Sequence, residues 1–154
     1  MLNELLSTEN IGFPLLSKSR GEMMEELVDL ADMSGKISNK EAILKQVSER
    51  EEILSTTVGK GVFIPRAKSS HLSGLCLSFG VTSLPLDFGA LDGNPVRFCI
   101  FLGIPETKIE EGIECLVRLF RLFNQDSFRG ALLKAKTKKD VIRIFEEEER
   151  DLER

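Results

Sequence analysis

The feature that most constrains the fold of this chain is the segregation of helical and strand-like patterns along it. Short apolar runs separated by turns occupy residues 74–104, and helical patterns lie on either side of them. A further apolar run, 11–16, predicts an edge strand, because Pro14 withholds one amide donor from any ladder. Segregated elements of this kind favour the α+β class. We expect residues 1–154 to form a single-domain α/β/α layered fold, with a mixed β-sheet covered by helices.

Two helices are predicted before the central strands. In residues 19–35 apolar side chains recur at helical spacing, and Gly35 ends the pattern. A second helix is predicted over residues 38–55, where Ser38 or Asn39 can provide the N-cap. We expect both helices to turn an apolar side toward the core. These sides consist of Met23, Met24, Leu27, Leu30 and Ala31 in the first helix and of Ala42, Ile43, Val47 and Leu54 in the second.

The central segment predicts three strands. They are expected over residues 74–80, 84–89 and 96–104, which are short, rich in apolar residues and separated by turn signals. Between the last two, Asp92 and Gly93 form a strong signal for a hairpin or tight turn.

The helix predicted over residues 109–124 is amphipathic. Its apolar face is expected to pack into the core, although a face of this kind also suits an interface between subunits, so the oligomeric state stays open. The face consists of Leu116, Leu119, Phe120 and Phe123.

Two more helices are predicted at the C-terminal end. Residues 126–135 begin with Asp126, which is expected to be the cap, and residues 137–154 begin with Thr137 and Asp140 in a capping-box pattern. The acidic end of the last helix, "EEEERDLER", is expected to be a solvated and fraying terminus.

Composition narrows the partners. The formal charge of −4 and the absence of Trp and Tyr argue against nucleic-acid binding, and the ten Phe residues lie mostly within apolar runs. No run of about 18 apolar residues exists, so we expect no membrane span. The first residues carry acids where a signal peptide would carry a basic segment, which favours the cytoplasm.

The cysteines and the single histidine indicate no metal site. Cys76, Cys99 and Cys115 are widely spaced and lie among apolar residues, so we expect buried thiols in a reducing compartment. With His71 as the only histidine, the chain offers no metal-ligand cluster, and we expect no cofactor.

The segment "TTVGKGVFIPRAK" carries the candidate site. A threonine is followed by two glycines one residue apart, an apolar pair and Ile-Pro. These residues are Thr57, Gly59, Gly61, Val62, Phe63, Ile64 and Pro65. The segment resembles the active-site segment of the type-2 IIA component of the bacterial phosphoenolpyruvate-dependent sugar phosphotransferase system, in its fructose, mannitol and nitrogen-regulatory branch.

Downstream segments extend the resemblance in the same order, over essentially the whole chain. They include residues 87–105 and the Asp-x-Phe-Arg element formed by Asp126, Phe128 and Arg129. The resemblance implies a protein that exchanges a phosphoryl group with the carrier HPr through a histidine placed after Ile-Pro.

In this chain the residue after Ile-Pro is Arg66. A neutral imidazole is nucleophilic near pH 7, whereas a guanidinium with a pKa above about 12 has no free lone pair to attack phosphorus. The resemblance also implies a second histidine early in the following helix, and Gly112 stands at about that place. We therefore expect a phosphotransferase-like protein that is inactive at the usual site and acts in regulation or interaction.

His71 is the alternative phosphoryl acceptor, and would make the chain an active phosphocarrier that takes the group from HPr. It lies five residues beyond Arg66 in a polar stretch, so an extended chain would place it more than about 10 Å away. An exposed loop histidine is the simpler interpretation.

Two interpretations of Arg66 stay open. In one, an unused active site has drifted; in the other, arginine is an adaptation that binds an anion or an acidic partner loop. A third possibility is that relatives retain histidine and only this sequence departs from them. The candidate partner or anion site consists of Thr57, Gly59, Lys60, Gly61, Pro65, Arg66 and Lys68. The partner expected there is an HPr-like carrier or a regulated protein.

Overall fold

Strand β6 (Val96–Pro105) organises the fold, because nearly all of its residues are buried and three other strands pair with it. It runs antiparallel to β5 (Cys76–Leu86) and parallel to β3 (Val62–Phe63) and β4 (Arg66–Ser69). The computed structural model describes residues 2–53 and 56–153. A strand buried on both faces requires a covering layer on each, and helices provide both.

The sheet is mixed, and its path runs β1-β5-β6-β3-β2, with β4 paired to β6 beyond β3. One edge is β1 (Ile11–Leu15), parallel to β5, and the other is β2 (Thr57–Gly59), antiparallel to β3. The edge strand expected around Pro14 is therefore confirmed, and the peptide bond before this proline is cis.

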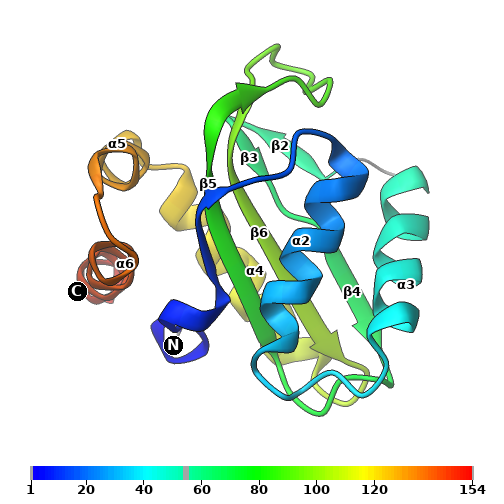
Figure 1. Ribbon diagram of the computed structural model, residues 1–154. Helices are drawn as coiled ribbons and strands as arrows, with labels where there is room; N and C mark the ends of the chain where they lie inside the picture. Colours follow the sequence, from blue (N-terminus) through cyan, green and yellow to red (C-terminus); the bar gives the residue numbers. More distant parts are fainter. Residues whose placement is uncertain (1, 54–55, 154) are drawn as a thin grey trace.

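Helices α2 (Arg20–Asp32) and α3 (Lys40–Ile53) cover one face of the sheet (Figure 1). Ser19 caps α2 by accepting a hydrogen bond from the Glu22 amide, and the Asn39 side chain accepts one from the Ala42 amide at the start of α3. Their buried side chains include Met23, Met24, Leu27, Val28 and Ala31 of α2 and Ile43 and Val47 of α3. Leu54, expected on the same side, lies outside the described residues.

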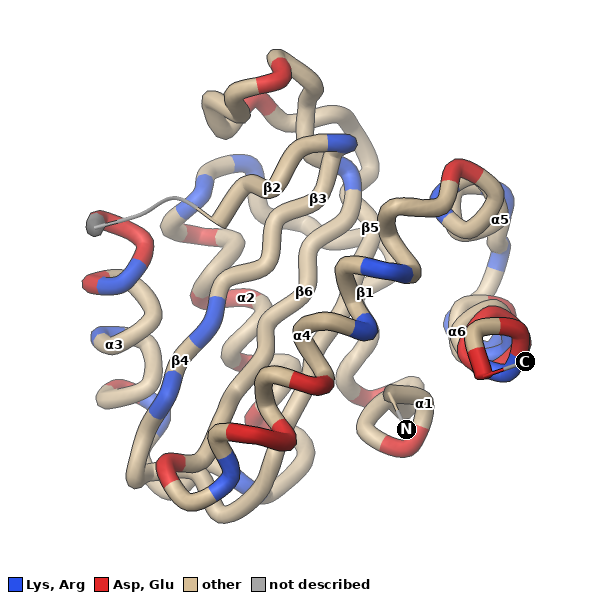
Figure 2. The backbone as a smooth tube through the Cα atoms, turned by 180° about the vertical axis from the view of Figure 1, so that it is seen from behind, with Lys and Arg blue, Asp and Glu red and all other residues tan. Residues whose placement is uncertain are grey.

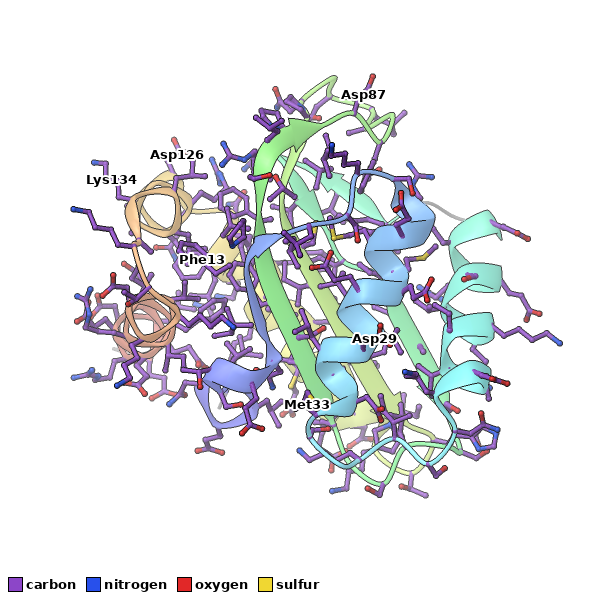
Figure 3. All side chains as sticks on the ribbon, in the orientation of Figure 1. Phe13, Asp29, Met33, Asp87, Asp126 and Lys134 are labelled. Atoms are coloured by element: carbon purple, nitrogen blue, oxygen red, sulfur yellow. The ribbon has the colours of Figure 1, made fainter. Side chains whose placement is uncertain are left out.

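The opposite face is covered by α4 (Ile109–Phe123), α5 (Asp126–Lys134) and α6 (Lys138–Leu152), with the short α1 (Leu2–Leu5) against α6. A 3-10 turn at Thr8–Asn10 connects α1 to β1. Figure 3 shows Phe13 on the side of β1 that faces α5 and α6, and the ends of α5 at Asp126 and Lys134. The centre of this layer is an aromatic cluster of Phe79, Phe123, Phe128 and Phe145, whose paired ring centroids lie 5.0–6.1 Å apart.

The predicted layered α/β/α fold with a mixed sheet is thus confirmed, and several details differ. The strands expected over 74–80 and 84–89 are parts of the single strand β5, because strand pairing with β6 resumes at Leu86 after an irregularity; residues 87–89 lie beyond its end. Gln125, not Asp126, occupies the N-cap position of α5. Both short helical turns before β1 were missed, since they carry no periodic pattern.

The acidic end of α6 differs most from expectation, because Glu149 is buried. Its carboxylate accepts hydrogen bonds from the amides of Leu2 (2.9 Å) and Asn3 (2.7 Å), the first residues of α1. Arg118 of α4 lies 3.8 Å from the same carboxylate. The predicted fraying terminus is wrong at this position, because one carboxylate joins α1, α4 and α6.

We expect Glu149→Gln to lower the free energy of unfolding by about 1.5–3 kcal/mol, the range for hydrogen bonds to a charged group. Urea unfolding followed by far-ultraviolet circular dichroism measures this change. Glu146→Gln is the matched control, because Glu146 is exposed on the same helix and its change should stay within about 0.5 kcal/mol. Equal stability of the two variants would show that Glu149 does not hold α1.

Candidate functional site

Strand β4 positions the basic residues of the candidate site. Side chains alternate along a strand, and Ala67 is buried in the core under α2 and α3. Arg66 and Lys68 therefore point to the opposite face, toward α4. Figure 2 shows the basic residues of β4 between α3 and α4. Register along β6 is fixed by the pairing of Arg66 with Leu102 and of Lys68 with Ile104.

A hollow of about 200 Å³ opens beside Arg66. Three cations line it, Arg66 and Lys68 from β4 and Arg50 from the last turn of α3. The other wall is apolar and comes from β6 and α4, with Ile104, Ile109, Ile113 and Leu116. We call this space the Arg66 hollow. It combines clustered positive charge with an apolar wall.

Arg66 is half-buried, and its surroundings oppose its charge. Burial lowers the pKa of the Arg66 guanidinium, the positive charge of Arg50 lowers it further, and Glu51 acts in the opposite direction. The buried Nε of Arg66 has no hydrogen-bond partner among the described residues. A cation in these surroundings is a strong candidate to receive an anion.

Glu51, the carboxylate whose charge favours Arg66, is buried and already engaged. Its oxygens accept hydrogen bonds from the Thr56 amide (3.0 and 3.2 Å) and the Thr56 hydroxyl (2.6 Å). Arg20 Nε lies 3.9 Å from it. Glu51 therefore offsets the positive charge of the hollow only in part.

The glycine turn predicted as part of the same site lies elsewhere. Gly59, Lys60 and Gly61 form the β2–β3 turn, and all three have positive φ (87°, 57° and 79°). The Lys60 amide donates to Asp92 (2.7 Å), and hydrogen bonds from the amides of Lys60 and Asn94 lower the pKa of that carboxyl. The Lys60 amide is therefore occupied by Asp92 of the β5–β6 loop rather than open to an external anion.

The turn borders a second and larger hollow of about 490 Å³. Its lining includes Val58, Lys60, Phe120, Arg121 and Asn124. We call this space the turn hollow. The Lys60 ammonium donates a hydrogen bond to the Asn124 side chain across it.

The two hollows are separated along β6. Gly61 accepts a hydrogen bond from the Phe98 amide, whereas Arg66 pairs with Leu102. Four strand residues correspond to about 13 Å. The predicted site is therefore divided between the two hollows. Arg66 and Lys68 line the Arg66 hollow, whereas Gly59 and Lys60 line the turn hollow.

An exposed apolar row on α4 connects the hollows. Ile113, Val117 and Phe120 lie on one side of the helix and are 54%, 51% and 38% exposed. Val58, 45% exposed, continues the row at the turn hollow. We call these four residues the α4 row. Phe120 therefore belongs to the surface and not to the core, which corrects the prediction, while Leu119 and Phe123 are buried as expected.

Thr57 and Pro65, the remaining residues of the predicted site, have structural roles in the strands beside the hollows. Thr57 pairs with Phe63 across the β2–β3 hairpin, and the Pro65 carbonyl accepts from the Leu102 amide (3.1 Å). Pro65 is buried, so it shapes the path of the chain between β3 and β4.

His71 lies beyond the end of β4, in the turn that follows. Its amide donates to the Ser69 hydroxyl, and its carbonyl accepts from the Ser38 amide (2.9 Å). The residues lining the Arg66 hollow do not include it. The backbone of His71 thus joins the turn after β4 to the segment before α3, whereas the Arg66 hollow is lined by β4 residues from Arg66 to Lys68.

Gly112 is buried in the first turns of α4 and packs on β6. A Cβ added at this position would lie 2.6 Å from Cγ2 of Ile104, so a larger side chain requires Ile104 to move. The α4 residues that line the Arg66 hollow are Ile109, Ile113 and Leu116, on successive turns of the helix.

Arg50 is the residue of the site that sequence reasoning missed. It belongs to a helix rich in Glu, Lys and Arg, where one more charged residue carries no signal of its own. Only the packing of α3 beside β4 places it next to Arg66.

The Asp-x-Phe-Arg element on which the resemblance partly rests is structural. Phe128 is buried in the aromatic cluster, and Arg129 donates to the Phe123 carbonyl (2.5 Å) and to Asp126. It joins the end of α4 to α5.

Comparison with known proteins identifies the family. Residues 4–148 match the family described as "Phosphoenolpyruvate-dependent sugar phosphotransferase system, EIIA 2". The chain belongs to this family. It is 28% identical over 149 residues to the fructose-specific EIIABC component of Bacillus subtilis, covering 97% of this chain and 24% of that protein's length.

Solved structures of the family agree with the fold. The nitrogen regulatory protein IIA-Ntr of Neisseria meningitidis superposes with a TM-score of 0.85 at 28% identity, covering 93% of this chain and 97% of that one. The Escherichia coli mannitol IIA, in a complex with phosphorylated mannitol IIB, superposes with a TM-score of 0.77 at 15% identity, covering 90% and 95%. This IIA-type fold therefore binds a protein partner in at least that relative.

Two further observations concern the described residues as a whole. Across residues 2–53 and 56–153, no group of three His, Cys, Asp or Glu side chains is arranged to hold a metal ion. Within the same ranges, every helix is too short or too polar to cross a bilayer.

The two arginines of the hollow should repel each other measurably. A double-mutant cycle of Arg50→Met and Arg66→Met measures the coupling free energy between the two side chains in the wild type. We expect this coupling to be unfavourable, by about 0.5 kcal/mol, because solvent screens charges that are partly exposed. Urea unfolding at low salt and at about 1 M NaCl measures it, because a charge coupling must shrink with salt. A coupling of zero or favourable sign would contradict the description of the hollow.

Proposed function

We propose that this chain is a IIA-type regulatory or interaction protein, of the nitrogen-regulatory kind, that does not accept a phosphoryl group at the usual site. The observation that carries this proposal is Arg66, which follows Ile-Pro in the segment resembling the family's active site and faces the hollow between α3 and α4. A guanidinium offers no free lone pair to phosphorus. The same hollow contains no histidine among its lining residues.

The α4 row and its two flanking hollows are the proposed partner surface. Exposed apolar side chains at regular helical spacing, bordered by Arg66 and Lys68 at one end and Lys60 at the other, suit a protein with apolar anchors and acidic groups. The complex of the mannitol IIA relative supports a protein partner. For this chain we propose an HPr-like carrier or a protein that it regulates.

The surroundings of Arg66 favour a role in binding a partner over the interpretation that an unused active site has drifted in sequence. A drifted exposed residue is expected to point into solvent, whereas Arg66 is half-buried beside Arg50 with an unpartnered Nε. Such a position costs stability, so arginine is better explained by an anion that it binds. Since Arg66 adds positive charge, the protein resembles the unphosphorylated rather than the phosphorylated state of a IIA protein.

We also propose that the protein is located in the cytoplasm. Cys76, Cys99 and Cys115 are free thiols, as in a reducing compartment. Cys76 and Cys99 are buried, and burial raises the pKa of the Cys76 thiol to about 11. Cys115 is only partly buried, which departs from the expectation for all three.

Phosphotransfer tests the proposal directly. The purified protein is incubated with phosphoenolpyruvate, enzyme I and HPr, and a phosphate-mass adduct is sought by intact-mass measurement at neutral pH. We expect no adduct on the wild type and an adduct on Arg66→His, because the new imidazole supplies the missing nucleophile.

His71→Ala is the control for the alternative acceptor. An adduct on the wild type that disappears in His71→Ala would replace the proposal by an active phosphocarrier that uses His71. His71 is not among the residues that line the Arg66 hollow, which favours the absence of an adduct on the wild type.

A further inference from the structure

We propose that a third hollow, between the edge strand β1 and helix α5, binds a small carboxylate with a short aliphatic body. This space of about 260 Å³ is lined by residues of β1, β5, β6 and α5 and by Lys136, and we call it the Arg97 hollow. It shares no lining residue with the Arg66 hollow or the turn hollow. A ligand bound here is therefore independent of whether Arg66 or His71 takes part in phosphotransfer.

An irregularity of β6 decides where Arg97, the one charged residue of this strand, points. The amides of Arg97 and Phe98 both donate to the Gly61 carbonyl, at 2.9 Å each, so two strand residues oppose one, as in a β-bulge. Strict alternation would place Arg97 on the face opposite Phe98. Instead, Phe98 packs in the core beneath α4 and α5, and Arg97 lines the hollow beside α5. Bulges commonly direct a side chain into a functional site in this way.

The guanidinium of Arg97 has a donor without an acceptor. One of its terminal nitrogens donates to the Thr82 carbonyl (3.1 Å). Its Nε is buried and has no hydrogen-bond partner within residues 2–53 and 56–153. None of the ion pairs within these ranges includes Arg97. A buried donor left unpaired costs free energy, so an acceptor bound in the hollow would offset that cost.

Lys136 provides a second cation from the helix layer. It lines the Arg97 hollow, is exposed, and lies on the connection between α5 and α6, where Figure 2 shows basic residues. The carboxylate nearest to it in sequence, Asp140, accepts hydrogen bonds from the amides of Lys136 (3.0 Å) and Thr137 (3.2 Å) and lies 3.4 Å from Arg143. These partners offset the charge of Asp140. The hollow therefore presents two cations to a bound anion.

The remaining wall of the hollow is mostly apolar. Phe13 and Pro14 of β1 lie on one side, and Leu132 and Leu133 of α5 lie on the other. Figure 3 shows that Phe13 is on the side of β1 that faces α5. Leu133 is 46% exposed, so a ligand that covered it would remove apolar surface from water.

This combination of groups favours a carboxylate over a phosphate. The two oxygens of a carboxylate suit the few donors present, which are Arg97 Nε, the Lys136 ammonium and the Ser83 hydroxyl. Inorganic phosphate has more oxygens to satisfy and no apolar part for the wall. The carbon chain of a carboxylic acid provides that part.

The volume of the hollow limits the length of this chain. At about 30 Å³ for each water molecule, it corresponds to about nine waters. It lies below the range of about 300–1,000 Å³ that is typical of sites for drug-sized ligands. A branched acid of about eight non-hydrogen atoms, such as 4-methylpentanoate, suits this space.

Titration of the protein with 4-methylpentanoate at low salt tests the proposal. The Arg97 Nε–Hε signal and the methyl signals of Leu132 and Leu133 report binding in nuclear magnetic resonance spectra. We expect a saturable shift with a Kd of about 1 mM or tighter. The uncharged 4-methylpentanamide, acetate, which lacks the body, and inorganic phosphate should each bind at least about tenfold more weakly.

Two lysine variants provide a matched comparison. Lys136→Gln should weaken binding of 4-methylpentanoate at least about threefold, because it removes one of the two cations. Lys134→Gln makes the same change of charge at an exposed position that does not line the hollow, so the Kd should stay within about twofold. Arg97→Gln should weaken binding at least about tenfold. The lysine pair decides the test even if Arg97→Gln does not fold, because both lysines are exposed.

The absence of a saturable shift with 4-methylpentanoate would overturn the proposal. Equally tight binding of the amide would contradict the role of the two cations, and equally tight binding of acetate or phosphate would contradict the role of the apolar wall. Equal effects of Lys136→Gln and Lys134→Gln would show that binding occurs outside the hollow. Each of these results would leave the proposed function intact, because phosphotransfer tests that function separately.

Discussion

The pairing of two short strands along one side of β6 is the constraint on which the site depends. β3 and β4 both run parallel to β6, and Ile64 and Pro65 lie between them. This arrangement carries the chain along one side of β6, from the glycine turn to Arg66, without a crossover helix. Since β6 is buried on both faces, its register cannot slip without exposing core side chains. The register of β6 therefore fixes that Arg66 and Lys68 lie on the face of the sheet toward α4.

The helices decide what these strand residues meet. α3 supplies Arg50 on one side of the hollow, and α4 supplies the apolar wall on the other. Gly112 allows α4 to lie closely on β6, because even a Cβ at this position would press on Ile104. Close approach of α4 narrows the space beside Arg66 and partly desolvates its guanidinium. Helix packing is thus the origin of both the shape and the unusual electrostatics of the hollow.

The same helix links the site to the rest of the molecule. One side of α4 carries the exposed apolar row, and Arg118 reaches the buried carboxylate of Glu149. Glu149 also holds the first amides of α1, so the N-terminal turn and the last helix are joined behind the partner surface. The buried carboxylate thus connects α4 and α6 to the N-terminal turn.

Local pattern by itself determined the layered fold, the main helices, the buried strands and the identity of Arg66 as a residue unable to attack phosphorus. These features follow from periodicity and side-chain chemistry, which act within a few residues of each other. Tertiary structure alone decided that Arg50 joins Arg66, that Lys60 belongs to a different hollow, that Phe120 is exposed and that Glu149 is buried. Each depends on contacts between segments far apart in the chain, where a charged or apolar residue has the same local signal whether it faces solvent, a neighbouring helix or another charge.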